Sequence, residues 1–237
     1  MRQDAGQADL PLVITDKIKG AQRLVAVSPE AKRLGLLPGL TLADARARIP
    51  DLRVEEADSH ADAALLERIA EDCDRYSPVI VTDAPDGLLI DITGCAHLFE
   101  GERELRRVFS ERLRKGGIHV RTVIATAPDA ARVLARFGRV AIVAPGEDAK
   151  AVRPLPVAAL QLADDHRIAI LRAGLRTIAD IADRPSLAFA ARFGEKMTLR
   201  LRRVLGEADP PLDPRRPAPM LWVERRFAEP IGRVEDI

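Results

Sequence analysis

Three aspartates, Asp83, Asp86 and Asp91, lie close together near the middle of the chain, where two apolar runs meet. The runs are Val79–Val81 and Leu88–Ile92, and the Asp, Pro and Gly residues between them predict two strands joined by a turn. Carboxylates are the ligands that Mg²⁺ prefers, so this junction is a candidate metal site. Aspartate is also an ordinary turn residue, and the pattern alone leaves both interpretations open.

Cysteine usage and hydropathy indicate a cytoplasmic protein. Cys73 and Cys95 are too few for a disulfide framework and lack metal-ligand spacing, so both are predicted to be buried thiols. No apolar run approaches the roughly 20 residues of a membrane span, and the first residues lack the apolar core of a signal peptide. We therefore expect no membrane contact. The four histidines are scattered and predict no histidine-based site: His60, His97, His119 and His166.

The composition supports folded domains with an uneven distribution of charge. A chain of 237 residues with 47% hydrophobic and 3% aromatic residues builds its cores from Ala, Leu, Val and Ile. The formal net charge is +1, but residues 51–104 carry 15 acidic and 4 basic side chains, whereas residues 167–216 carry 11 basic and 6 acidic ones. The basic stretch suggests contact with a polyanion, although an arginine-rich composition unrelated to binding explains it equally well.

Apolar periodicity and capping residues predict most of the remaining elements of the first 150 residues. The order from residue 61 is helix, strand, strand, helix, strand, which is most of a ferredoxin-like α+β unit without the strand before its first helix. Besides the strand pair 79–92, we predict strands at 12–15, 24–27 and 118–126, helices at 41–49, 61–75, 103–115 and 129–137, and an acidic loop at 51–60.

The chain changes character from Pro154 onward, where short helices replace the mixed pattern. Five are predicted, at 156–161, 165–173, 177–183, 185–193 and 195–205. Five prolines within Asp209–Pro219 predict a stiff linker. Residues 220–237 begin a further domain, and Trp222–Phe227 alternates like an edge strand that has no sheet to join.

Three segments together resemble a Y-family DNA polymerase of the translesion type. Ser28–Gly35, with the following Leu37–Leu42 and Ile49–Leu52, is similar to the family's fingers pattern. Ala84–Thr93 is similar to the palm signature S-I-D-E-A-x-x-D-V-T, and Leu171–Asp180 to the thumb pattern L-x-x-x-G-I-x-T-x-x-D-L.

The resemblance covers roughly residues 11–207 and implies an incomplete α+β polymerase core, with a ferredoxin-like palm and a small all-α thumb. The domains that it implies are a fingers-like segment at 1–57 that lacks the first palm strand, a palm-like domain at 58–150, a thumb-like domain at 151–208, a linker at 209–219 and the start of a missing little-finger-like domain at 220–237.

The chain departs from the family at the positions that bind the metal ions and the nucleotide in family polymerases. The Asp-Glu pair of the palm signature becomes Asp86-Gly87, and the H-x-D-M-D segment with the other metal ligand and the steric-gate aromatic is absent. The fingers Tyr is replaced by Pro29 and its Arg partner by Lys32. The resemblance thus makes Asp86 a relict ligand and Lys32 a relict nucleotide-binding position. We expect no catalytic residues, no metal and no cofactor; an active enzyme would use Mg²⁺.

The chemistry of phosphoryl transfer agrees with this expectation. Two-metal catalysis needs several carboxylates that converge on ions about 3.5–4 Å apart. Asp83 and Asp91 are available to join Asp86, but Asp91 has the opposite strand parity and so points to the other face of a regular strand.

A subgroup of the family, the ImuB-type proteins of bacterial mutasomes, shows the same loss of acids. The runs Gly20–Val25, Gly94–Gly101 and Phe227–Ile231 are similar to this subgroup. The resemblance implies that the chain acts as an adaptor protein in damage-induced, error-prone DNA synthesis. The implied partners are DNA, the sliding clamp, an accessory error-prone replicative polymerase and a RecA-like accessory protein, although no clamp-binding motif is visible in these residues.

The basic residues of the thumb-like part are the candidate DNA contacts. The first thumb hairpin, Gln161–Asp165, has two acids and no glycine, which disfavours contacts from its backbone N–H groups to phosphate. Side-chain contacts remain, with a solvated helix face as the alternative. The candidate residues are Arg172, Arg176, Arg192, Lys196, Arg200, Arg202 and Arg203.

The sequence therefore favours a non-catalytic, polymerase-like scaffold in damage-induced translesion synthesis. One alternative is an active lesion-bypass polymerase truncated at its N-terminus. Another is a DNA-binding module without partner proteins.

Overall fold

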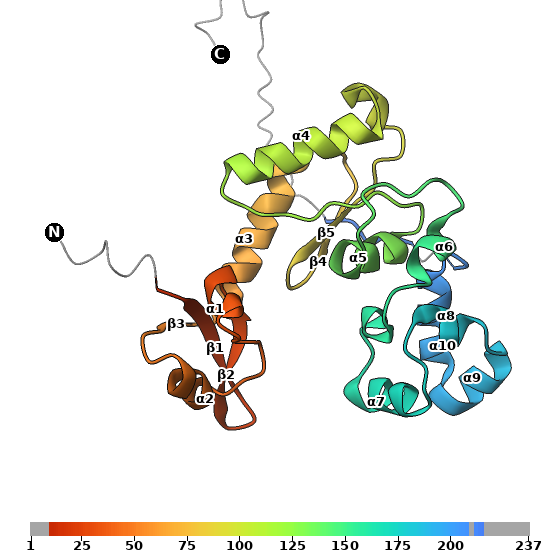
Figure 1. Cartoon of the computed structure of the whole chain (residues 1–237). Coiled ribbons are helices and arrows are strands. Elements are labelled where there is room, and N and C mark those ends of the chain that lie inside the picture. The colour runs from red at the N-terminus through yellow and green to blue at the C-terminus, as the bar shows by residue number, and fades with distance from the viewer. Residues whose placement is uncertain (1–9, 209–210, 216–237) are drawn as a thin grey trace, which may run out of the picture. The chain divides into compact units, whose positions relative to one another are not determined.

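The computed structural model describes residues 10–208 and 211–215, with the helices and strands shown in Figure 1. The chain divides into two compact units, residues 1–65 and 66–237. Within the described residues, none of the helices combines the length and the apolar character needed to cross a membrane.

The first unit is built on a three-stranded sheet. Its strands are β1 (Leu12–Ile18), β2 (Ala21–Val27) and β3 (Arg53–Glu56), in the order β2-β1-β3, and its helices are α1 (Pro29–Arg33) and α2 (Leu42–Arg48). β1 pairs antiparallel with β2 and parallel with β3. The core of this unit consists of small and aliphatic side chains: Val13, Leu24, Ala31, Leu36 and Ala45.

The two strands predicted in this unit and its 41–49 helix are confirmed. The Thr41 hydroxyl accepts a hydrogen bond from the Asp44 N–H at 3.1 Å and so caps α2, as its position in the sequence indicates. The prediction of a loop at 51–60 is wrong for Arg53–Glu56, because β1 offers this acidic segment a free edge for pairing and Val54 packs against the core.

The second unit begins with a strand pair between two longer helices. Its first elements are α3 (Ser59–Asp72, which starts in the first unit), β4 (Ile80–Asp83), β5 (Gly87–Ile90), the 3₁₀ helix η1 (Ala96–Phe99), α4 (Glu102–Lys115), α5 (Pro128–Phe137) and α6 (Asp148–Val152). β4 and β5 are antiparallel. Tyr76 anchors the core beneath them, with its ring 5.3 Å from Phe109 and 5.5 Å from Phe99.

The helices predicted beyond Pro154 are confirmed, the first of them as a 3₁₀ helix. They are η2 (Val157–Leu160), α7 (Asp164–Arg172), α8 (Ile178–Ala182), α9 (Ser186–Phe193) and α10 (Glu195–Val204). One apolar cluster joins them to α5: Val133 and Leu134 belong to the same core as Ile178 and Val204. The palm-like and thumb-like segments therefore share a core across residue 150.

The strand predicted at 118–126 does not form. Only Ile124 makes a β-bridge there, in parallel with Ile142. A β-branched sequence needs partner strands to stabilise it. Within the described part of the chain, 141–143 supplies one partner and the other side has none.

The predicted linker lies partly outside the described residues, and residues 220–237 lie wholly outside them. In the described part, Arg215 is bound to the fold. Its N–H donates to the Ile80 carbonyl at 2.7 Å, and its guanidinium pairs with Glu67 at 3.1 Å and Asp74 at 3.2 Å.

The two cysteines differ in burial, so the prediction that both are buried is wrong for Cys95. Cys73 is 1% exposed, and burial together with Asp72 and Asp74 raises its pKa to about 11, whereas Cys95 is half-buried. Because the thiolate is the nucleophile, iodoacetamide is expected to alkylate Cys95 well before Cys73 in the folded protein. Mass spectrometry of a time course measures this, with urea-unfolded protein as the control in which both react. Equal rates in the folded protein would contradict the assignment.

Candidate functional site

The aspartates of the β4–β5 turn are paired with arginines of α5. Arg136 Nη1 donates to Asp83 Oδ2 at 2.9 Å, and its Nη2 donates to Asp86 Oδ1 at 2.7 Å. Arg132 Nε donates to the same Asp83 oxygen at 2.9 Å. The two guanidinium groups therefore hold the carboxylates that the sequence presents at this turn.

The pairing continues through α5 to α10. Asp129 accepts hydrogen bonds from Arg132 and, at 2.8 Å, from Arg200 Nη1. The Asp129 side chain is 4% exposed, and a carboxylate this deeply buried is stable only when it is paired. Together these contacts form an arginine network, which we define as Asp83, Asp86, Asp129, Arg132, Arg136 and Arg200.

The helical repeat of α5 explains how one short helix serves this network. Asp129, Arg132 and Arg136 are spaced at i, i+3 and i+7, which places them on one face of an α-helix. The Arg136 guanidinium is partly buried, which lowers its pKa, but its hydrogen bonds to Asp86 and Asp83 outweigh this and hold the pKa above the ordinary value. The resemblance and the apolar periodicity do not predict this network, although the D-x-x-R-x-x-x-R spacing is a readable signal for it.

Gly87 lies directly beside the network. A Cβ atom at this position would lie 3.0 Å from Arg136 Nη2 and 3.2 Å from the Asp83 carbonyl oxygen. A glutamate here, as the palm signature has it, would require the Arg136 guanidinium to move. The absence of a side chain at Gly87 thus leaves room for Arg136, and the Arg136 guanidinium lies in the space next to Asp86.

The side chains at this position do not fit a two-metal centre. Asp83 and Asp86 both direct oxygens at arginines, and Asp91 instead accepts a hydrogen bond from the Thr93 N–H at 2.9 Å. Among the described residues, no group of three or more His, Cys, Asp or Glu side chains is arranged to hold a metal ion. Two-metal chemistry needs carboxylates whose oxygens face the ions, and here they face guanidinium groups.

The relict nucleotide position lies in the first unit. Ser28 caps α1 by accepting from the Ala31 N–H at 3.2 Å, so Pro29 falls at the start of that helix, where proline is well tolerated. Pro29 and Lys32 are both exposed. His97 is also exposed.

The predicted DNA contacts divide by exposure. Arg200 belongs to the arginine network and Arg203 is half-buried. The others are exposed: Arg172, Arg176, Arg192, Lys196 and Arg202. Arg202 approaches Glu207 at 3.9 Å, and the Arg192 guanidinium lies 5.3 Å from the centre of the Phe193 ring.

Comparison with known proteins identifies the family. Residues 1–136 match the model of the impB/mucB/samB family. The chain belongs to this family. It is 42% identical to Protein ImuB of Caulobacter vibrioides over 205 aligned residues, and this alignment covers 86% of this chain and 45% of that protein. It is 23% identical over 196 residues to DNA polymerase IV 2 of Mesorhizobium japonicum, covering 81% and 47%. The chain thus spans about half the length of these relatives.

Solved structures confirm the incomplete Y-family fold that the sequence predicts. DinB from Sulfolobus solfataricus superposes with a TM-score of 0.71, and the insertion ternary complex of Dbh DNA polymerase with a TM-score of 0.73. In both cases the identity is 18%, and the match covers 89% of this chain and 64% of the other. The resemblance to the ImuB type is confirmed by the identity with that protein.

Proposed function

We propose that this chain is a non-catalytic, polymerase-like scaffold in damage-induced, error-prone translesion DNA synthesis and DNA repair. Its 42% identity to Protein ImuB supports a role of this kind. The proposed partners are DNA, the sliding clamp, an accessory error-prone replicative polymerase and a RecA-like accessory protein. The proposed location is the cytoplasm. The proposed domain boundaries are those that the resemblance implies in the sequence analysis above.

The arginine network is the observation that carries the non-catalytic part of the proposal. Arg132 and Arg136 supply the positive charge at Asp83 and Asp86 that Mg²⁺ would supply in a phosphoryl-transfer enzyme. The Glu of the palm signature's Asp-Glu pair is replaced by Gly87, whose neighbour is Arg136. These ion pairs support the proposal that both aspartates serve the fold rather than a metal ion.

A primer-extension assay tests this proposal directly. The chain, incubated with primer–template DNA, nucleotides and Mg²⁺, is expected to extend no primer above the level of a heat-inactivated sample. Mg²⁺ in place of EDTA is also expected to leave the thermal unfolding temperature unchanged, because no ion is bound by the native state alone. Mg²⁺-dependent extension would overturn the proposal.

The second candidate is an active lesion-bypass polymerase that is truncated at its N-terminus and uses Mg²⁺. The fold likeness to the Dbh insertion complex is the observation in its favour.

Affinity capture with clamp and accessory polymerase, run beside filter binding on primer–template DNA, separates the scaffold from a module that binds DNA alone. Capture of neither protein in the presence of robust DNA binding would favour the module.

A further inference from the structure

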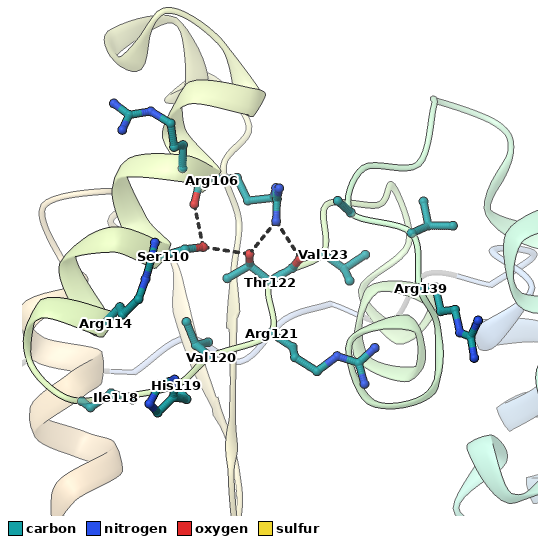
Figure 2. Close-up of a pocket in the computed structure, with 13 residues that line it drawn as sticks. Arg106, Ser110, Arg114, Ile118, His119, Val120, Arg121, Thr122, Val123 and Arg139 are labelled. Carbon is teal, nitrogen blue, oxygen red and sulfur yellow. Dashed lines mark hydrogen bonds between the residues drawn. The ribbon is translucent and has the colours of Figure 1, made fainter.

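A cavity of about 560 Å³ lies in the second unit, where α4, the extended segment 118–123 and the residues 139–141 that follow α5 come together. Figure 2 shows the side chains that line it. Five of them are arginines, and none of the described residues that line the cavity is acidic. A chain with a formal net charge of +1 therefore concentrates positive charge in one hollow. The arginines are Arg106, Arg107, Arg114, Arg121 and Arg139.

Only one of these arginines is neutralised by the protein. Arg107 Nε donates to Glu104 Oε2 at 2.9 Å, and its Nη1 donates to Glu111 Oε2 at 2.7 Å. Both acids belong to α4 itself, and neither lines the cavity. In the described part of the chain, the other four arginines have no ion-pair partner: Arg106, Arg114, Arg121 and Arg139.

Two of the four are held in place by neutral oxygens. Arg106 Nη1 donates to the Thr122 hydroxyl at 3.1 Å (Figure 2), and its buried Nε has no hydrogen-bond partner among the described residues. The Arg121 guanidinium donates to the Arg136 carbonyl at 3.0 Å and to the Gly138 carbonyl. Carbonyl and hydroxyl oxygens orient a guanidinium without supplying a full negative charge, so the charges of Arg106 and Arg121 stay available.

The arginine network shows how this fold treats partly buried arginines elsewhere. Arg132, Arg136 and Arg200 each meet a carboxylate of the protein. The cavity beside α4 has guanidinium groups of comparable density and no carboxylate to match them. A hollow lined by one sign of charge concentrates ions of the opposite sign, because its low-dielectric walls strengthen the field inside it. The missing negative charge can come from a bound anion.

The charge and the volume of the cavity favour a phosphate chain over an acidic peptide. A triphosphate carries roughly four negative charges near neutral pH, because its terminal phosphate has a second pKa near 6. An extended peptide directs every second side chain to one face, roughly 6.6 Å apart, and so brings fewer charges into the same length. The arginine fork donates paired hydrogen bonds to phosphate oxygens. The volume lies within the roughly 300–1,000 Å³ of small-molecule sites.

We propose that this cavity binds a polyphosphate anion, through the phosphate chain that nucleoside triphosphates and inorganic triphosphate share. Arg106 and Arg121 are already oriented and hold the phosphates, and the exposed Arg114 and Arg139 complete the contact. The binding needs no metal ion, since the cations are guanidinium groups. None of the palm-signature residues 84–93 lines the cavity, so the site is distinct from the β4–β5 turn and independent of the scaffold role.

Isothermal titration calorimetry of the whole chain in EDTA tests the proposal, with inorganic triphosphate and ATP as the probes. Each is expected to bind saturably at one molecule per chain. The double variant Arg114→Gln/Arg139→Gln removes two exposed cations of the cavity and is expected to weaken binding at least tenfold, because each charge-assisted contact contributes about a factor of ten. Arg103→Gln/Arg112→Gln makes the same change in net charge on α4 outside the cavity and is expected to leave the affinity nearly unchanged.

A second pair of variants keeps every arginine. Val140 lines the cavity and is 44% exposed, so a polar side chain is tolerated there. Val140→Glu places a carboxylate among the guanidinium groups and is expected to weaken triphosphate binding at least tenfold. Val140→Gln has nearly the same shape without the charge and is expected to bind like the wild type. Equal affinities of these two variants would contradict an anion site at this position.

The probes also identify the ligand and the results that overturn the proposal. Equal affinity for inorganic triphosphate and ATP would show that the phosphate chain alone is recognised, and tighter binding of ATP that a nucleoside adds contacts; both outcomes support the proposal. Absence of saturable binding would overturn it, and so would equal losses in the two double variants. Binding that requires Mg²⁺ would assign the ligand to a polymerase-type nucleotide site instead. A glutamate peptide or single-stranded DNA that binds more tightly than triphosphate, with the same dependence on Arg114 and Arg139, would also overturn it.

Discussion

Replacing Asp129 with alanine is expected to lower the free energy of unfolding of the second unit by about 3 kcal/mol. The substitution removes a carboxylate that is 4% exposed and leaves Arg132 and Arg200, 20% and 23% exposed, without their shared partner. Uncompensated buried charge is the cause of the loss. Arg132 keeps Asp83, and Arg200 Nε still donates to the Leu160 carbonyl at 3.4 Å, which keeps the effect at the lower end of the range for buried pairs.

Urea denaturation followed by circular dichroism measures this loss, and two variants calibrate it. Asp129→Asn keeps a hydrogen-bond acceptor without the charge and is expected to fall between the wild type and the alanine variant. Lys150→Ala removes an exposed ion pair with Glu147 and is expected to change stability little. If Asp129→Ala proved as mild as Lys150→Ala, the arginine network would not stabilise the link between α5 and α10.

Local patterns predicted most of the helices of this chain because helices depend on nearby residues. Thr41 and Thr177 cap α2 and α8 as their positions indicate, and the Gly residues after α9 and α10 end those helices. The two exceptions among the strands have a common cause. Arg53–Glu56 is a strand because the distant β1 pairs with it, and 118–126 is not one because a neighbour is missing. Neither pairing is encoded in the segment itself.

The sequence predicts where the candidate site lies, but not which side chains contact one another in it. The resemblance to the palm signature marks Asp86 and Gly87 as the place where this chain departs from the family's pattern. What the aspartates of this turn contact depends on Arg132 and Arg136, which lie about fifty residues further along the chain. Only the fold brings α5 against the β4–β5 turn, so the ion pairs of the turn aspartates become visible only in three dimensions.

The arginine network also changes which thumb residues are available to DNA. The sequence groups Arg200 with the other basic residues of the thumb-like part, yet its guanidinium is bound to Asp129. A phosphate contact from Arg200 would cost this internal pair. We therefore propose that the exposed members of the set make the electrostatic contact with DNA.

Replacing Arg172, Arg176, Arg192 and Lys196 together with glutamine is expected to weaken DNA binding strongly at low salt. All four side chains are exposed, and the described structure gives none of them an ion-pair partner. Each phosphate contact contributes about 0.9 to the slope of log K against log salt concentration for duplex DNA. Loss of four contacts is therefore expected to reduce the magnitude of that slope by about three to four units. The affinities of the wild-type chain and the quadruple variant for the same DNA are then expected to converge as the salt concentration rises.

Fluorescence anisotropy with labelled duplex DNA across a salt series measures the slope. The matched control replaces four exposed cations of α4 with glutamine, Arg103, Arg112, Arg114 and Lys115, and so makes the same change in net charge. If the thumb residues contact phosphates, the control keeps most of the wild-type slope. Equal slopes for the two quadruple variants would show that only total charge matters, and the thumb residues would then be a solvated helix face. Arg200→Gln completes the comparison, because it should lower stability while leaving the salt slope of the folded protein unchanged.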